Sequence, residues 1–572
     1  MSFPFVASLP DWMEYIEGEA PIVLVAPHGG RRPSDAPVQD SVKVNDLHTA
    51  GLTRQLAART GGYALINQSL DRNEIDLNRV SQVRTDAPWF PVALLELVSH
   101  LVAAYGTAKV FFVHGWNVVQ PVCDLGVGLK QHGTRLVPAG KGAPTVGSAF
   151  VSEELLPFQT AGAAAGLDVA LGRRYPAAAK NNFMQVFSPR FAQDESLPIR
   201  TLAELSSQEK IHAVQLELGV GLRWPGPERD RFIDIFCRTL GQAPKPLPQG
   251  GRDFSHLNLA GSDVSAGRDG AFLPVHHGAQ PSRMSLHFHD LVSGLGLTGG
   301  IEFDAQASTH SGRLLLSLGG TEMLLFTGED AASPHSNQVR IGGYVWQRHA
   351  DGLSISYRGT AMRFSHPQAF IRLEDGLAAS WIEPLEMRLQ LSIPQPSSPP
   401  PVPIYLARLH GELRLRDRNA AIDAWGFMDM LRAEEAGRLL PRQLVSLPFG
   451  PDLGIFLART ELPEGPRSAG VIYAHGQPYP LRPSDWELDY VHEHGRPVTF
   501  ELSLNPDLPD FSLSLNCQGK TTTAIPVVRH VTQGRALAVT FGMAETCWQG
   551  RQARGVYEFS EFLKKPVGRA SA

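Results

Sequence analysis

The residues best suited to chemistry in this chain are two histidines, each placed just after an apolar run. The run at 22–25 leads into His28 on a Pro-His-Gly-Gly turn, and the run at 109–113 leads into His114, which precedes a glycine. Parallel strands of one sheet end at the same edge, where α/β proteins bind ligands. We therefore expect the two imidazoles to meet at that edge.

A carboxylate would complete a metal site with these histidines. Asp46 lies at the start of the first expected helix, and a catalytic zinc ion typically has three protein ligands and one open position. His28, Asp46 and His114 are therefore candidate ligands, with His48 as an alternative. Asp46 could instead be a helix N-cap or a first-turn carboxylate, and both histidines could be hydrogen-bonded turn residues.

Glu217 interrupts the apolar run at 211–218. A carboxylate in a buried strand must be paired or functional. Next to an activated water, Glu217 could take up a proton and later deliver it to a leaving amine. The alternative is an edge strand on which Gln215 and Glu217 face solvent.

Two arginines, Arg72 and Arg79, flank Asp76 in a polar block after the second expected strand. A guanidinium binds a carboxylate in a two-pronged geometry that lysine cannot copy. One arginine could hold a substrate carboxylate while the other pairs with Asp76. A structural ion-pair network is the alternative explanation.

In their chain order these segments resemble the N-formylglutamate amidohydrolase family over about residues 15–240, with the Asp-Leu-Asn-Arg block at 76–79 as the most diagnostic piece. The resemblance implies a phosphorylase/hydrolase-like α/β fold related to zinc carboxypeptidases. It also implies Zn2+ bound by His28, Asp46 and His114, Glu217 as general base, substrate contacts from Arg72 or Arg79 and Asn78, and supporting roles for Asp76 and Gln215.

The chain departs from that family in two places. Members often carry an acidic residue two positions before the second histidine and a serine after it, where this chain has Phe112 and Gly115. An acidic neighbour orients a ligating imidazole, so another group must do so here. The Lys-Asn-Asn-Phe segment at 180–183 replaces a Gly-Gly-Tyr-like segment, so formylglutamate is not assumed as the substrate.

Alternating strand-like and helix-like patterns predict an α/β layer sandwich for the first 240 residues. Strands are predicted at 21–27, 63–67, 109–114, 167–171 and 211–218, and helices at 44–59, 91–105 and 227–240.

Beyond this region period-2 alternation, as at 353–358 and 412–416, predicts an all-β half. The Gly-Gly pair at 319–320 predicts a tight hairpin. A helix-like stretch around 427–440 is the exception.

Proline-rich joints at 241–250 and 394–403 predict a multi-domain chain: an amidohydrolase-like α/β domain at 1–243, and two lipocalin-like barrels or sandwiches at 251–395 and 402–572. The segments 425–429 and 555–559 resemble the lipocalin-like carotenoid hydratase and AttH-like group, which implies an apolar cavity for a lipophilic ligand.

Four polar residues of the β half stand out. His287 and His289 could be a metal pair or simply two histidines on one face of a strand, and Asp429 and Glu558 could be acids within a barrel cavity.

Composition excludes several classes. The 572 residues are 43% hydrophobic and 19% charged with a net charge of −5, which gives no argument for nucleic acid. The sequence contains no run of 18 or more apolar residues, so no membrane span is predicted. The N-terminal segment lacks the features of a signal peptide. Four cysteines without CxxC spacing exclude a Cys-based zinc site and suit a cytoplasmic location.

The sequence therefore predicts a cytoplasmic, zinc-dependent amidohydrolase that cleaves a linear C–N amide bond in a small, carboxylate-bearing, N-formyl or N-acyl amino-acid-like substrate. Its β module would bind a lipophilic ligand. The alternative is a small-molecule binding protein, or an isomerase or hydratase, with a degenerate hydrolase domain.

Overall fold

The computed structural model describes residues 3–33, 43–132, 135–241, 251–254, 257, 281–290, 293–304, 309–319, 322–331, 338–349, 352–366, 373–394, 402–432, 441–462, 465–493, 496–506, 515–531 and 535–562. The described residues divide into two compact units, one up to residue 257 and one from residue 281 onward. Nearly all of the two proline-rich joints, at 242–250 and 395–401, lies outside the described residues. The three domain boundaries remain predictions.

A seven-stranded mixed sheet forms the centre of the first unit, in the order β1-β3-β2-β4-β9-β5-β8. Strands β3, β2, β4 and β9 are parallel, whereas β5 runs antiparallel to β9. The bounds are β1 (Met13–Ile16), β2 (Ile22–Ala26), β3 (Tyr63–Asn67), β4 (Ala108–Gly115), β5 (Val122–Gly126), β8 (Asp168–Leu171) and β9 (Ile211–Leu218). All five predicted strands are present, and β1 and β5 are additional.

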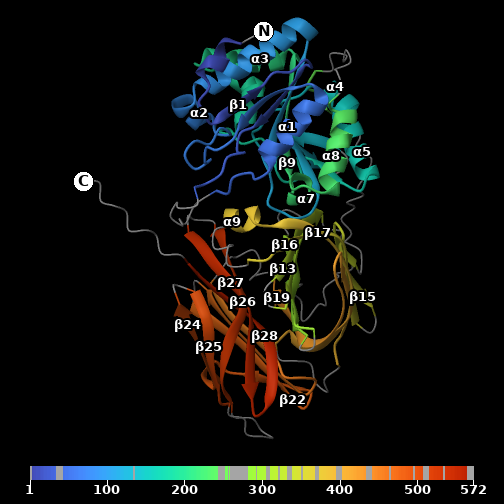
Figure 1. Ribbon diagram of the computed structural model, residues 1–572, viewed down its shortest axis with the longest axis vertical. Helices are drawn as coiled ribbons and strands as arrows, with labels where there is room; N and C mark the ends of the chain where they lie inside the picture. Colours follow the sequence, from blue (N-terminus) through green and yellow to red (C-terminus); the bar gives the residue numbers. More distant parts are fainter. Residues whose placement is uncertain are drawn as a thin grey trace, which may run out of the picture. The chain divides into compact units, whose positions relative to one another are not determined.

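Helices cover both faces of this sheet (Figure 1), and each face has its own apolar cluster. One face carries α1 (Thr49–Thr60), α5 (Leu156–Ala164) and α8 (Pro227–Arg238), and the other carries α3 (Trp89–Tyr105) and α6 (Leu197–Ser207). Burial on both faces explains why the strands appear as continuous apolar runs. The predicted α/β sandwich is confirmed, although α1 begins five residues later than expected.

Shorter elements connect this framework: β6 (Leu129–His132), β7 (Arg135–Pro138), α2 (Val80–Asp86), α4 (Ser148–Phe150), α7 (Val220–Arg223) and the 3-10 turn η3 (Phe183–Phe187). In the described part of the chain, no single helix has the length and apolar character to cross a membrane. Helices α2 and α3 meet that criterion only as a pair bent by 103°.

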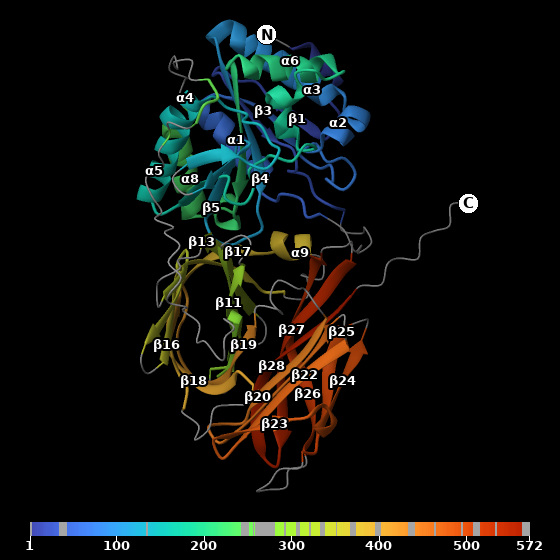
Figure 2. The same cartoon turned by 180° about the vertical axis from the view of Figure 1, so that it is seen from behind.

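The second unit contains a closed, antiparallel, eight-stranded barrel, which pairing between β13 and β16 completes (Figure 2). Its strands are β10 (Pro281–His289), β11 (Leu295–Asp304), β12 (Thr309–Leu318), β13 (Glu322–Ala331), β16 (Gly352–Phe364), β17 (Trp381–Ser392), β18 (Ile404–Leu415) and β19 (Asn419–Arg432). The hairpin β14 (Gln338–Ile341) and β15 (Tyr344–His349) extends from β16, and α9 (Leu373–Ala378) precedes β17.

Aromatic side chains fill part of the barrel interior. The rings of Phe326 and Tyr357 lie 4.7 Å apart, and the ring of Tyr344 lies 5.7 Å from Phe326. A Cβ on Gly299 would lie 3.0 Å from the Tyr344 hydroxyl, so this glycine of β11 gives the ring its space. The alternation at 353–358 thus places Leu353, Ile355 and Tyr357 on one buried face, as predicted.

The remaining strands form an antiparallel nine-stranded sheet around a separate apolar core. They are β20 (Arg442–Pro448), β21 (Leu453–Leu462), β22 (Gly465–Ala474), β23 (Gln477–Leu481), β24 (Trp486–Glu493), β25 (Arg496–Leu504), β26 (Leu515–Val531), β27 (Arg535–Trp548) and β28 (Arg551–Phe562). The expectation of an all-β half is confirmed.

Two local expectations have different outcomes. The hairpin is confirmed because β12 and β13 pair in antiparallel fashion on either side of Gly319, although residue 320 lies outside the described residues. The helix around 427–440 is wrong for 427–432, which belong to β19 and pair with β10 and β18. Residues 433–440 lie outside the described residues.

Candidate metal centre

The turn after β2 presents His28 at the edge of the sheet because its glycines allow a close backbone approach. A Cβ on Gly29 would lie 2.5 Å from the Asn67 carbonyl oxygen, and one on Gly30 only 2.0 Å from that of Leu70. The Asn67 side chain donates to the carbonyls of Pro27 and Leu70 and joins the ends of β2 and β3. His28 is thus fixed and fully buried.

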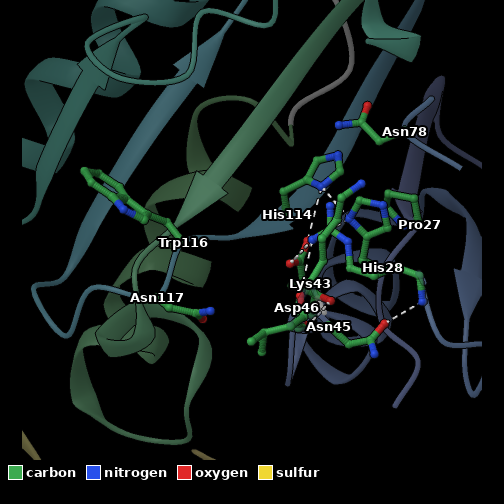
Figure 3. A network of polar contacts seen from close by, with 12 residues as sticks. Pro27, His28, Lys43, Asn45, Asp46, Asn78, His114, Trp116 and Asn117 are labelled. Carbon is green, nitrogen blue, oxygen red and sulfur yellow. Dashed lines mark hydrogen bonds and ion pairs between the residues drawn. The ribbon is translucent and has the colours of Figure 1, made fainter. Parts of the chain in front are cut away.

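Three candidate ligand atoms converge at this edge (Figure 3). Nδ1 of His28 lies 3.1 Å from Oδ2 of Asp46, Nδ1 of His114 lies 3.2 Å from the same oxygen, and the two nitrogens are 3.2 Å apart. Neighbouring ligands of tetrahedral zinc are about 3.3–3.4 Å apart, given bonds of about 2.0–2.1 Å. Within the described ranges this is the one His/Cys/Asp/Glu group able to hold a metal ion.

Hydrogen bonding orients the His28 ring toward this triangle. Its Nε2 lies 2.7 Å from Oδ1 of Asp76, and in the neutral tautomer with the proton on Nε2 the lone pair of Nδ1 faces Asp46 and His114. A cation would satisfy all three converging atoms at once, whereas a proton could serve only two. The donor set of two imidazoles and one carboxylate therefore fits zinc.

Both oxygens of Asp46 are used. While Oδ2 faces the histidines, Oδ1 accepts a hydrogen bond of 3.1 Å from Arg72. Burial opposes ionisation of Asp46, yet Arg72 and His28 hold its pKa well below the usual value. The N-cap alternative is wrong, because α1 begins at Thr49 after His48 in a left-handed conformation.

His48 is not part of the triangle. Its ring lies 4.3 Å from that of Trp224, and burial together with the charge of Arg223 lowers its pKa to about 4. The alternative in which His48 is a ligand receives no support from this placement.

His114 occupies the end of β4 in a form suited to bind metal. Burial, with the charges of His28 and Arg72, lowers its pKa to about 4 despite the neighbouring Asp46 carboxylate. The imidazole is therefore neutral near pH 7, as metal binding requires. Its Nε2 is buried without a hydrogen-bond partner among the described residues, and Phe112, at the position of the family's acidic residue, packs in the apolar cluster.

Glu217 lies beside His114 because the two are register partners on the parallel strands β4 and β9. Strand β9 lies between β4 and β5 and both Gln215 and Glu217 are buried, so the edge-strand alternative is wrong. Gln215 donates to Glu217 at 2.7 Å and accepts from Asn182 at 3.1 Å. Burial and the nearby Asp46 raise the pKa of Glu217 well above its usual value; a bound cation would oppose this shift.

The two arginines of the 71–79 block differ in burial and in hydrogen bonding. Arg72 is largely buried and bonded to Asp46 and the Val44 carbonyl. The Arg79 side chain is 41% exposed, and its Nε lies 3.5 Å from Asp76. The Asn78 amide oxygen is buried without a hydrogen-bond partner among the described residues, and Figure 3 shows this side chain on the far side of His114 from Asp46.

Two functional candidates were missed from the sequence. Lys43 bonds Asp76 at 2.7 Å, and no local pattern in its surroundings marks it. Arg223 is fully buried near Asp46 and Glu217. An arginine directly after the apolar residues 220–222 was a usable signal for the latter, because a buried guanidinium needs partners.

In the β half, His287 and Asp429 lie on the outer face of the barrel, whereas Leu286 and Met428 point to its interior. Asp429 forms a 2.9 Å ion pair with Arg442 of the nine-stranded sheet, and its other oxygen lies 3.7 Å from Nε2 of His287. Asp429 therefore lies outside the barrel cavity, contrary to the prediction from the sequence. Glu558 pairs in register with Leu444, which packs against the barrel's outer face, so it too lies outside the cavity.

No family model and no curated protein matches this sequence. Among solved structures, CghA is similar over 53% of this chain and 98% of its own, with 10% identity and a TM-score of 0.31. An N-formylglutamate amidohydrolase from Ralstonia eutropha JMP134 is similar over 40% of this chain and 96% of its own, with 15% identity and a TM-score of 0.27. Kievitone hydratase from Nectria haematococca is similar over 49% of this chain and 87% of its own, with 8% identity and a TM-score of 0.29.

Proposed function

We propose that the first unit is a zinc-dependent hydrolase that cleaves a C–N amide bond in a small, carboxylate-bearing substrate. The observation that carries this proposal is the buried triangle of His28, Asp46 and His114, with sides of 3.1–3.2 Å. A bound zinc ion would polarise the amide carbonyl and bring the pKa of its water toward neutrality.

The chain's own residues then divide the remaining work. Glu217 accepts the proton of the attacking water on a carboxylate oxygen and delivers it to the nitrogen of the leaving amine. Gln215 holds that carboxylate through its 2.7 Å hydrogen bond, and Asn182 holds Gln215. Asp76 orients the ring of His28 through Nε2, and Arg72 orients the carboxylate of Asp46 through Oδ1.

Arg79 is the better candidate for binding the substrate carboxylate. Arg72 is largely buried and bonded to Asp46, whereas the Arg79 side chain is 41% exposed and its Nε lies 3.5 Å from Asp76. Its two terminal nitrogens can form a two-pronged bond to a carboxylate. The buried amide oxygen of Asn78, which has no hydrogen-bond partner among the described residues, can accept an N–H from the same substrate.

The test uses full-length protein that has never been exposed to chelator, assayed on N-formyl and N-acyl amino acids. Glu217→Gln should keep about one equivalent of zinc but lower kcat by roughly 10²–10⁴-fold, the usual contribution of general acid–base catalysis. The matched control is Glu154→Gln, which removes a carboxylate paired with Lys109 elsewhere in the unit. Full activity of Glu217→Gln would exclude this mechanism.

A second function, small-molecule binding, is favoured by a cluster of buried polar atoms in the β half. Nδ1 of His287 and the Thr298 and Ser446 hydroxyls lack hydrogen-bond partners among the described residues, and Nε2 of His287 faces one oxygen of Asp429 at 3.7 Å, beyond hydrogen-bond distance. Buried polar atoms are normally paired with protein, water or ligand. We propose that a lipophilic molecule with a polar group binds here, where the barrel packs on the nine-stranded sheet.

Thermal-shift screening of the full chain against lipophilic alcohols and acids tests this second function. A binding compound should raise the Tm of the wild type but not of His287→Leu, whereas His410→Leu, at an exposed position of β18, should respond like the wild type. Equal shifts in both variants, or no shift with any compound, would exclude the site.

A further inference from the structure

Arg223 is joined to three separate segments of the metal centre. It is completely buried at the end of α7. Its Nε donates to the Leu218 carbonyl at 3.0 Å, and one terminal nitrogen donates to the Leu47 carbonyl at 2.8 Å. The other terminal nitrogen donates to the Trp116 carbonyl at 3.2 Å and the Asn117 amide oxygen at 2.9 Å.

These acceptors follow the functional residues directly in the sequence. Leu47 comes one residue after Asp46, Leu218 one residue after Glu217, and Trp116 two residues after His114. One rigid guanidinium therefore fixes the backbone beside two proposed ligands and the proposed base. Its planar fork is suited to such a role, because the donors hold fixed directions.

Gly115 explains how the guanidinium reaches this position. A Cβ at residue 115 would lie 2.5 Å from a terminal nitrogen of Arg223 and 3.0 Å from the Cβ of Asp46. The glycine after His114 thus leaves the space in which Arg223 passes between the ligand segments. Its φ is not among the positive values, so alanine would be excluded by contact and not by backbone conformation.

We propose that Arg223 is a positioning residue that sets the ligand geometry of the metal centre and the placement of Glu217. This inference rests on the proposed zinc function. It assigns Arg223 no contact with the substrate. Neighbouring groups in turn support Arg223: the ring centroid of Trp224 lies 5.1 Å from the guanidinium carbon, and Arg229 donates to the Arg223 carbonyl.

The experiment measures metal affinity by competition with a chromophoric chelator, and coordination geometry from the visible spectrum of the Co2+-loaded full chain. Arg223→Met should weaken zinc binding at least tenfold and alter the Co2+ spectrum, and Arg223→Lys should restore only part of each. The matched control is Arg252→Met, because Arg252 also donates to backbone carbonyls, those of Pro144 and Ser206. It should lower the Tm while leaving both metal readouts unchanged.

Gly115→Ala keeps the test decisive if Arg223→Met does not fold, since it displaces the guanidinium without removing its charge. Gly51→Ala is its control, because a Cβ there meets nothing closer than 3.9 Å. A folded Arg223→Met or Gly115→Ala protein with wild-type zinc affinity and Co2+ spectrum would overturn the role of Arg223 alone. A wild-type protein that binds no metal would overturn both this role and the proposed function.

Discussion

Nε2 of His28 lies 2.7 Å from Oδ1 of Asp76, and both side chains are almost completely inaccessible to solvent. A carboxylate behind a ligating imidazole fixes the tautomer and makes the ring a stronger donor to metal. The second oxygen of Asp76 pairs with Lys43 at 2.7 Å. Asp76 of the Asp-Leu-Asn-Arg block therefore orients the ring of His28 in the candidate metal centre.

Replacement of this carboxylate should weaken metal binding. We expect Asp76→Ala to reduce zinc affinity by roughly 10–100-fold, the usual effect of losing an outer partner of a ligand. Chelator competition measures it. Asp168→Asn, which removes the charge of an acid paired with Arg173, should bind zinc like the wild type. An Asp76→Ala affinity within twofold of the wild type would contradict this role.

Substitutions of Arg79 and Arg72 should change different quantities, KM for Arg79 and zinc affinity for Arg72. Arg79→Gln should raise KM at least tenfold with zinc content unchanged, because a charge-assisted hydrogen bond contributes about 1.5–3 kcal/mol. Arg72→Gln should instead weaken zinc binding, because Asp46 loses a donor. A substrate analogue with a carboxamide in place of the carboxylate should show no KM difference between wild type and Arg79→Gln. The opposite pattern would make Arg72 the substrate anchor.

Acid should destabilise the first unit partly through His212, which is remote from the proposed ligands in the sequence. Its ring stacks on Phe150 at 4.5 Å, and burial with the charges of Lys109 and Arg252 lowers its pKa from 6.5 to about 3. Between these values the unfolded chain binds a proton that the folded chain does not. Stability from this group is therefore complete above pH 6.5 and declines as the pH falls toward 3.

Denaturant titrations at several pH values between 7.5 and 5 measure this effect. As the pH falls, the unfolding equilibrium constant of the wild type should increase more steeply than that of His212→Gln. The difference can reach about tenfold for each unit by which the pH is lowered, which is the limit for the uptake of one proton. His366→Gln, at an exposed position, should follow the wild type. Parallel curves for His212→Gln and the wild type would show that His212 does not contribute.

Much of the candidate metal centre could be predicted because of where apolar runs end. The parallel strands β2, β4 and β9 end at one edge of the sheet. The sequence therefore sufficed to predict that residues as distant along the chain as His28 and Glu217 lie close together. Strand β5 was not predicted, although it pairs with β9 in the sheet, and its antiparallel direction has no signature in the sequence. The role of Asp46 was also ambiguous, because the same carboxylate near a helix start suits an N-cap.

Residues whose hydrogen bonds go to distant backbone groups were the hardest to find. Arg223 bonds carbonyl groups more than 100 residues away, and backbone acceptors leave no trace in a sequence. Strand β10 gives a second example. Its alternation separates Leu286 from His287 but cannot show which face is inside, because packing buries both faces.

The most direct test of zinc binding at this site is zinc-edge anomalous diffraction from crystals of protein purified without chelator. One strong peak is expected within about 2.0–2.2 Å of Nδ1 of His28, Nδ1 of His114 and Oδ2 of Asp46, the bond lengths for zinc with nitrogen and oxygen ligands. A map without a peak among these three atoms, from protein supplied with zinc, would contradict it.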